Sequence, residues 1–200
     1  MTREYISVAE AKALIGLSGD DETWDAHITK LIEAVCQAID FRCKRTFAPA
    51  SGDSVRYFHT RGGRIAQVDD FTSLTSLYYD DSMDRSYGQE LTDDTDFICQ
   101  PQNELPYRWV ELLPGGDLDK FPVQQYALKI TATWQYASEV PDIVKTACEI
   151  LVTRLFKRKD TSFATIIASG TFDAMEIYRG MDPDAAMLLE PVSRKRIVIR

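Results

Sequence analysis

Apolar residues between positions 24 and 43 recur at steps of three and four, the spacing that places side chains on one face of an α-helix. They are Trp24, Ile28, Leu31, Ile32, Val35, Ile39 and Cys43. Arg42, Lys44 and Arg45 gather at the end of this stretch, where the helix dipole favours cations. The pattern predicts a long amphipathic helix with one buried face.

A second apolar stripe begins after Pro141, a residue type favoured in the first turn of a helix. The stripe consists of Val144, Cys148, Leu151 and Leu155, and three cations follow it: Lys157, Arg158 and Lys159. This pattern predicts a second long helix. The pattern of residues 161–178 is ambiguous, because residues 163–168 fit an extension of this helix while residues 171–178 fit a strand.

Two short helices are predicted near the chain ends. Ser7 and Glu10 have the spacing of a capping box, so a helix is expected to start there and to end at Gly16. The dipeptide at 182–183, Asp-Pro, predicts the start of another helix, which covers residues 185–189.

Between the two long helices the hydrophobic period changes to two, which is typical of half-buried strands. The predicted strands cover residues 55–59, 64–68, 74–79, 97–100, 108–113 and 127–136. Their connections are short and rich in glycine and proline, so antiparallel pairing is expected. The predicted fold class is α+β. A helical bundle, residues 1–50 and 138–190, carries an inserted antiparallel β region, residues 51–137, and an extended C-terminal arm, residues 191–200.

Composition indicates a globular protein. Of the 200 residues, 44% are hydrophobic and 27% are charged, which excludes wholesale disorder. No apolar run approaches the roughly 20 residues that span a bilayer, and the N-terminus lacks the apolar core of a signal peptide. We therefore expect a soluble protein of a reducing compartment with no membrane partner.

The net charge of −8 is unevenly distributed. Residues 1–140 carry 23 acidic and 13 basic side chains, whereas residues 141–200 carry 8 acidic and 10 basic ones. An acidic body binds nucleic acid poorly, because affinity for phosphate comes from Lys and Arg. Such a body can still line a passage through which DNA slides.

The residue types that carry enzyme chemistry form no recognisable site. The cysteines, Cys36, Cys43, Cys99 and Cys148, form no C-x-x-C pair, so buried apolar side chains are expected rather than zinc ligands or a disulfide. His27 and His59 have no obvious partner nearby in sequence for a catalytic triad. Phosphate-binding loops, nucleophile elbows and metal-binding motifs are missing, so we expect no cofactor and no catalysis.

Acidic residues crowd the segment 69–96, where Arg85 alone opposes them. They are Asp69, Asp70, Asp80, Asp81, Asp84, Glu90, Asp93, Asp94 and Asp96. Solvated turns of a β region are the preferred interpretation, because the spacing fits no recognised metal loop. Carboxylate pairs also perform acid–base catalysis and bind Ca²⁺ or Mg²⁺. A metal-dependent hydrolase using Asp69, Asp70, Asp80 and Asp81 is therefore an alternative.

Two basic features lie near the C-terminus. The first is the cluster Arg154, Lys157, Arg158 and Lys159. Its cations either stabilise the C-terminal end of the helix by interacting with the helix dipole or, repeated around a ring, contact DNA or a neighbouring subunit. The second is the chain end, Arg194, Lys195, Arg196, Ile197, Val198, Ile199 and Arg200. Its apolar, β-branched triplet suits addition to a partner's sheet, and an edge strand in the protein's own β region is an equal alternative.

Three segments carry a family resemblance. The first is Y-I-S-V-A-E-A-K-A-L-I-G-L with the long helix that follows and the basic, aromatic R-C-K-R-T-F. The second is I-T-A-T-W-Q-Y with the proline-initiated helix and its basic end K-R-K-D. The third is D-P-D-A-A-M-L-L-E-P. In this order they resemble the head–tail connector (adaptor) proteins of tailed bacteriophages, and the β region resembles the insertion of the longer members.

The resemblance implies a non-enzymatic structural protein of the virion neck that is assembled in the host cytoplasm. Such proteins form a ring, commonly of twelve subunits, beneath the portal protein, where the ring extends the channel for double-stranded DNA without sequence-specific binding. The ring also offers a surface to the next neck or tail protein. Members like this chain dock onto the portal through the segment here numbered Arg194–Arg200, with Glu190, Pro191 and Val192 as its base.

Other functional classes stay open at this point. The nearest is another neck protein, such as a stopper or tail-completion subunit. The more distant ones are the metal-dependent hydrolase and a bacterial adhesion or regulatory module that carries a β domain.

Overall fold

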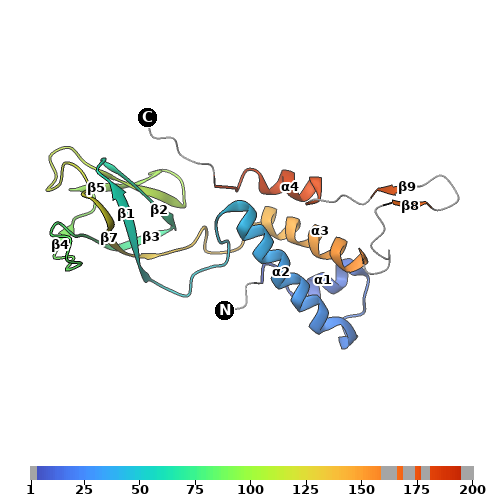
Figure 1. Ribbon diagram of the computed structural model, residues 1–200. Helices are drawn as coiled ribbons and strands as arrows, with labels where there is room; N and C mark the ends of the chain where they lie inside the picture. The colour runs from blue at the N-terminus through green and yellow to red at the C-terminus, as the bar shows by residue number, and fades with distance from the viewer. Residues whose placement is uncertain (1–3, 159–165, 169–173, 177–180, 195–200) are drawn as a thin grey trace. The chain divides into compact units, whose positions relative to one another are not determined.

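The computed structural model describes residues 4–158, 166–168, 174–176 and 181–194. The chain divides into two compact units, a helical unit formed by Met1–Ala48 with Val140–Arg200, and a β unit formed by Pro49–Glu139 (Figure 1). The fold class is α+β, as predicted, with four α-helices and two larger antiparallel sheets among the described residues.

The helical unit follows the sequence prediction closely. Its elements are α1 (Val8–Ile15), the 3₁₀ turn η1 (Glu22–Trp24), α2 (Asp25–Cys43), α3 (Asp142–Arg158) and α4 (Pro183–Leu189). Ser7 and Glu10 form the predicted capping box, and Gly16 ends α1 with a φ of 84°, a left-handed conformation that costs glycine little. Asp182 caps α4 by accepting a hydrogen bond from the N–H of Asp184 at 3.0 Å.

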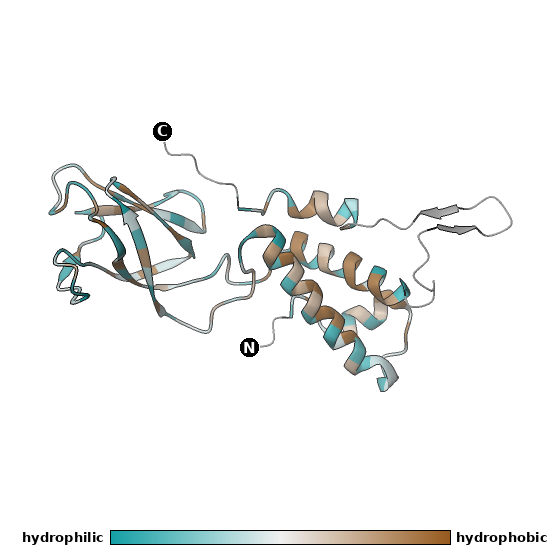
Figure 2. Cartoon of the chain, in the orientation of Figure 1, coloured by the Kyte–Doolittle hydropathy of each residue, from teal (hydrophilic) through white to brown (hydrophobic). Residues whose placement is uncertain are grey.

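The core of the helical unit forms where α1, α2 and α3 contact one another, and α4 packs on α3. The buried residues of the two long helices are Ile28, Ile32, Val35, Cys36, Ile39 and Cys43 from α2, and Val144, Ala147, Cys148, Leu151, Val152 and Phe156 from α3. Figure 2 shows apolar bands, in brown, along both helices. Leu155, predicted as part of the stripe, is 39% exposed, because it lies off the buried face.

The cysteines are all free thiols. Cys36, Cys43 and Cys148 are buried in the helical unit as predicted. Cys99 is only partly buried. Beyond α3, β8 (Ile166–Ala168) pairs antiparallel with β9 (Ala174–Glu176). The predicted strand is confirmed there, and the alternative of a helical extension is wrong for residues 166–168.

The β unit contains seven strands among its residues: β1 (Ser54–Arg61), β2 (Ile65–Phe71), β3 (Ser73–Tyr79), β4 (Gln89–Leu91), β5 (Phe97–Gln100), β6 (Tyr107–Leu112) and β7 (Val123–Thr133). One sheet has the order β1-β7-β3-β4 and the other β2-β6-β5. All pairs are antiparallel. The six predicted strands are confirmed, β5 with the predicted ends and the other five with shifted ends. β4 was missed because three residues are too few to show alternation.

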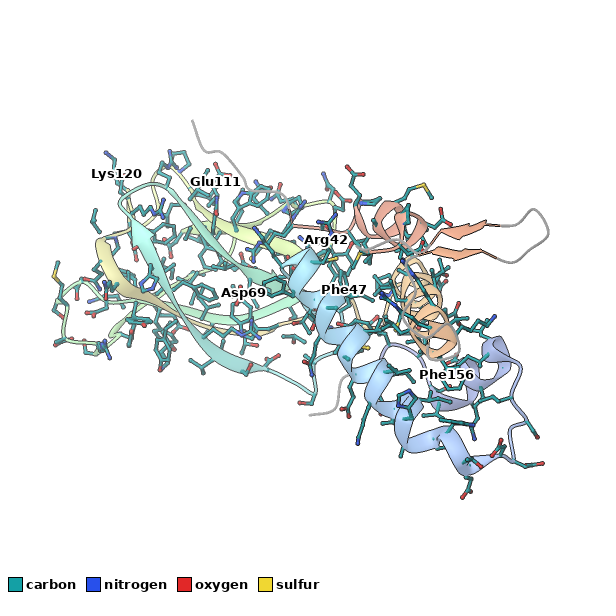
Figure 3. The ribbon with its side chains drawn as sticks, turned by 45° about the vertical axis from the view of Figure 1, so that its right-hand side comes forward. Arg42, Phe47, Asp69, Glu111, Lys120 and Phe156 are labelled. Atoms are coloured by element: carbon teal, nitrogen blue, oxygen red, sulfur yellow. The ribbon has the colours of Figure 1, made fainter. Side chains whose placement is uncertain are left out.

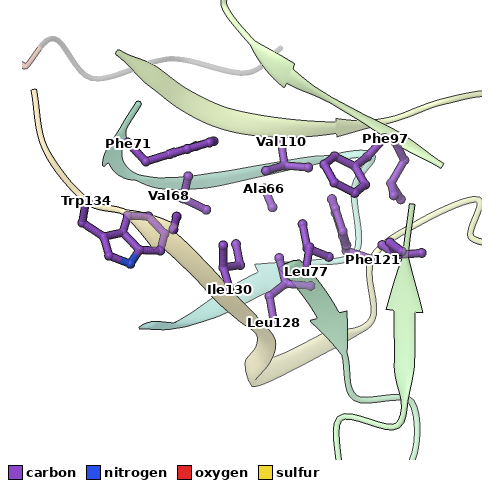
Figure 4. Packing of buried hydrophobic residues seen from close by; sticks show 13 residues of the cluster. Ala66, Val68, Phe71, Leu77, Phe97, Val110, Phe121, Leu128, Ile130 and Trp134 are labelled. Atoms are coloured by element: carbon purple, nitrogen blue, oxygen red, sulfur yellow. The ribbon is translucent and has the colours of Figure 1, made fainter. Parts of the chain in front are cut away.

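A hydrophobic core lies between these two sheets (Figure 4). Leu77, Leu128 and Ile130 from the four-stranded sheet belong to the same buried cluster as Ala66, Val68 and Val110 from the other sheet. Aromatic rings of Phe71, Phe97, Phe121 and Trp134 complete it. Because every buried member of this cluster lies between residues 66 and 134, the β unit has a core of its own.

The chain enters and leaves the β unit at neighbouring positions. The backbone N–H of Ala50 donates to the side-chain Oε1 of Gln135 at 2.9 Å, and the indole Nε1 of Trp134 donates to the carbonyl of Ser54 at 2.7 Å. Closely spaced ends are the geometry in which an insertion interrupts its host least.

Candidate assembly surfaces

The first described part of the predicted arm is anchored to the helical unit. Val192 is buried, and the hydroxyl of Ser193 donates to the carbonyl of Leu189 at 2.7 Å. The N–H of Arg194 donates to the carbonyl of Cys43 at 2.9 Å. Cys43 ends α2, where carbonyls lack partners within the helix, so Arg194 satisfies one of them. The expected arm is therefore fixed over residues 191–194 rather than extended from its start, and residues 195–200 lie outside the described residues.

A buried network of hydrogen bonds holds the C-terminal end of α2, to which Arg194 is bound. The segment R-C-K-R-T-F turns back after α2, and Phe47 is fully buried (Figure 3). The N–H of Phe47 donates to the hydroxyl of Tyr5 at 3.0 Å, and that hydroxyl donates to Asp40. Burial of Tyr5 and its bond to the Asp40 carboxylate raise the pKa of the phenol well above its ordinary value. The chain that follows α2 is thus tied by hydrogen bonds to Tyr5 and, through it, to Asp40.

The residues of the predicted basic cluster differ in their burial and in their contacts. The guanidinium of Arg154 lies 3.3 Å from the Asp182 carboxylate, with a side chain only 21% exposed, so it links α3 to the cap of α4. Lys157 is exposed, Arg158 is partly buried, and Lys159 lies outside the described residues. Arg154 therefore has a structural role, which the sequence did not reveal because Asp182 is 28 residues away.

Each helix of this unit also exposes one large apolar side chain. Phe41 on α2 is 86% exposed and Met187 on α4 is 64% exposed, while Leu14 and Leu155 are exposed to a lesser degree. Sequence analysis missed Phe41, because it stands outside the apolar stripe between two charged residues. An aromatic side chain this exposed on a rigid helix is a candidate contact with another protein.

The acidic residues of the β unit organise its turns. Asp80 accepts hydrogen bonds from the N–H groups of Ser82 and Arg85, at 3.2 and 2.9 Å. Asp96 accepts them from Thr92 and Asp117, at 2.7 and 2.9 Å. The two bonds to Asp96 favour its ionised form and lower the pKa of that carboxyl.

The expectation of solvated carboxylates needs correction at three positions. Asp70, Asp80 and Asp96 are buried, and for the last two the backbone N–H groups of adjacent turns replace the water. Asp69 forms an ion pair with Arg56 at 2.7 Å. Across the residues that the structure describes, no group of three or more His, Cys, Asp or Glu side chains is placed to hold a metal ion.

The two histidines make packing and backbone contacts. The ring of His27 lies 6.1 Å from that of Phe156, labelled in Figure 3, and 6.2 Å from that of Trp24. His59 accepts a hydrogen bond from the N–H of Tyr126 through Nδ1 at 3.1 Å. In the described part of the chain, no helix is long and apolar enough to cross a membrane.

Comparison with known proteins identifies the fold. No protein-family model and no curated protein matches the sequence. A chain from the virion of a native gene transfer agent (GTA) particle is similar in structure, with a TM-score of 0.57 and 17% identity. A chain from the neck of an empty GTA particle, computed with C6 symmetry, has a TM-score of 0.56 and 15% identity. Each match covers 97% of this chain and 92% of the other, so the likeness in fold spans both units.

Proposed function

We propose that this chain is a structural protein of a virion neck, specifically a head–tail connector (adaptor) that forms a ring beneath the portal. The observation that carries the proposal is the likeness in fold to chains of GTA virion and neck structures over 97% of the chain. The resemblance of three sequence segments to phage connectors supports the same role independently, because it was found in the order of residues rather than in the fold.

The segment that we assign to portal docking is the chain end, Arg194–Arg200. Arg194 is bonded to α2, so the six residues that follow start from a fixed point and reach roughly 20 Å when extended. Their apolar triplet, Ile197 to Ile199, is suited to strand addition and the flanking cations to fixing its register. Because the arm starts from a fixed point, less conformational entropy is lost when it docks. Twelve arms that bind together give a much higher overall affinity than one arm alone.

Ring closure requires that one face of a subunit contact a different face of the next. The exposed Phe41 and Met187 side chains are our candidates for these contacts. In a ring, the net negative charge of the chain lets double-stranded DNA pass without tight binding, and Lys157 with Arg158 provides the few cations near the end of α3. The rim of the ring that faces away from the portal binds the next neck or tail protein.

The docking role is tested by truncation after Arg194, which keeps every described hydrogen bond of the helical unit. We expect a folded protein that no longer sediments with portal-bearing heads. A full-length variant with Ile197→Asp and Ile199→Asp should fail in the same way, because both apolar anchors are lost. The matched control, Leu14→Asp with Leu155→Asp, makes the same chemical change on the helical unit and should still dock.

Normal attachment of the truncated chain to portal-bearing heads would contradict the docking assignment. Attachment only to heads that already carry another neck protein would identify the chain as a stopper or tail-completion subunit instead.

A further inference from the structure

The four-stranded sheet of the β unit has an open edge. Among the described residues, β1 pairs only with β7, and it spans eight residues, Ser54–Arg61, most of them exposed. In an antiparallel strand, alternate residues turn their N–H and C=O groups away from the partner strand. Natural edges are commonly protected by proline, lysine, a β-bulge or a short length. β1 contains neither proline nor lysine, and its register with β7 is regular from Ser54 to Phe58, before the shift between Phe58 and Thr60. The regular part of the open edge is therefore Ser54–Phe58.

An aromatic face lies beside this edge. The register places Tyr57 of β1 opposite Lys129 of β7, and Lys129 opposite Tyr78 of β3. Tyr57 is 49% exposed, and its ring lies 5.4 Å from that of Tyr87. His59 and Tyr126 form a second ring pair at 4.6 Å. Aromatic residues are enriched in the centres of protein interfaces, so side chains of an added strand would meet a suitable surface.

The charged residues of β1 indicate which kind of protein segment can bind at its open edge. β1 contains Arg56 and Arg61 and no acidic residue. Arg56 already pairs with Asp69 of β2, whereas Arg61 is exposed at the end of the strand. A second copy of β1 would bring like charges together, which is destabilising across a strand pair. The basic chain end, residues 194–200, would be repelled for the same reason.

We infer that the open edge of β1 binds an extended acidic segment of a partner protein, which adds a fifth strand to the sheet. Backbone hydrogen bonds to β1 supply the affinity. On the exposed face that Val55 and Tyr57 share with Arg61, apolar side chains of the segment pack beside Val55 and Tyr57, and a carboxylate further along the same face of the segment meets Arg61. This inference concerns the β unit alone and does not depend on the proposed docking of the chain end to a portal.

The test is a titration of the ¹⁵N-labelled full-length chain with the eight-residue peptide Glu-Thr-Glu-Thr-Val-Thr-Val-Thr, blocked at both ends, at millimolar concentration. Paired antiparallel to β1, this peptide places its valines beside Val55 and Tyr57 and its first glutamate beside Arg61. We expect the backbone amide resonances of residues 54–61 to shift, and the shifts to weaken as salt rises. The same peptide N-methylated at every second residue is the matched control. It keeps the charge but cannot pair along one edge, and it should leave these resonances unchanged.

A charge reversal identifies the recognising residue. Arg61→Glu should weaken peptide binding by about two- to fivefold, the range of an exposed ion pair. Arg42→Glu changes the net charge equally but lies on α2, and it should leave binding unchanged.

Three results would overturn the inference. The first is an acidic peptide that shifts resonances elsewhere but not those of β1. The second is a peptide of residues 194–200 that binds β1 as tightly as the acidic one. The third is a protein that self-associates through β1, since the edge would then belong to a second copy.

Discussion

The helical unit and the β unit stabilise their buried polar groups in different ways. In the helical unit, the Tyr5 hydroxyl bonds to Asp40 and joins residues 35 positions apart. In the β unit, the Asp80 and Asp96 carboxylates accept hydrogen bonds from backbone N–H groups in turns. The network of Tyr5 needs a neutral phenol, because the pKa of that phenol is raised. The turn of Asp96 favours an ionised carboxyl, because the pKa of that carboxyl is lowered. These two networks are therefore expected to weaken at opposite ends of the pH scale.

The largest effects are expected from core truncations, one in each unit. Ile39 of α2 and Ile130 of β7 are both fully buried, so Ile39→Ala and Ile130→Ala should each reduce the free energy of unfolding by about 2–5 kcal/mol. Amide hydrogen exchange will report the loss as faster exchange in α2 and α3 for the first variant and in β7 and β3 for the second. A cost below about 1 kcal/mol for either would mean that its unit lacks a packed core.

The next effect concerns the helical unit at alkaline pH. Tyr5→Phe removes both bonds of the hydroxyl and should cost about 1–3 kcal/mol at neutral pH. Because the pKa of Tyr5 is raised in the folded state, its contribution is complete below the unfolded value near 10 and is lost as pH rises from there toward the folded value. Urea unfolding between pH 8 and 11 should therefore show a shallower alkaline decline for Tyr5→Phe. Equal declines in both proteins would argue against the network.

The turn that Asp96 holds in the β unit should show the opposite pH dependence. Asp96→Ala removes the two turn hydrogen bonds and should cost about 1–2 kcal/mol at neutral pH. The pKa of Asp96 is lowered in the folded state, so its contribution is present above the unfolded value near 4 and is lost as pH falls through the folded value. Hydrogen exchange of residues 92–97 measured from pH 7 to pH 3 should show this acid loss for the natural chain and little of it for the variant.

The smallest effect separates the two roles of Asp182. Asp182→Ala removes both the α4 cap and the ion pair with Arg154 and should cost about 1 kcal/mol. Asp182→Asn keeps a capping oxygen and loses only the charge, so it should cost a few tenths of a kcal/mol. Exchange of the α4 amides distinguishes them. If the asparagine variant frays as much as the alanine variant, the ion pair rather than the cap holds the start of α4.

The local parts of this fold were predictable from sequence. The capping box at Ser7, the left-handed Gly16 and the stripe of α2 depend on residues within a turn or two of one another, so their patterns are visible in the chain. The six longer strands of the β unit were visible for the same reason. Its sheet order, with β1 beside β7, depends on pairing between residues far apart, such as Val55 with Thr131, and alternation alone does not specify it.

The candidate surfaces were less predictable than the elements that carry them. The chain end was recognised by its unusual composition, but the bond between Arg194 and Cys43 joins opposite ends of the chain. Phe41 gave no signal, because an apolar residue off the stripe looks like ordinary variation. The expectation of solvated turns was right for only part of the acidic segment, because Asp69 and Asp70 lie in β2 and Glu90 lies in β4. The buried Asp96 accepts one of its hydrogen bonds from Asp117, which no short pattern connects to it.

We propose that the chain assembles on a portal through its C-terminal end. The most direct test is the mass of the purified protein, alone and mixed with the portal ring encoded by the same genome, for the full-length chain and for the chain truncated after Arg194. The account predicts a full-length protein that collects on the portal as a closed ring, and a truncated protein that stays in solution. A full-length protein whose mass is unchanged by the portal would contradict it.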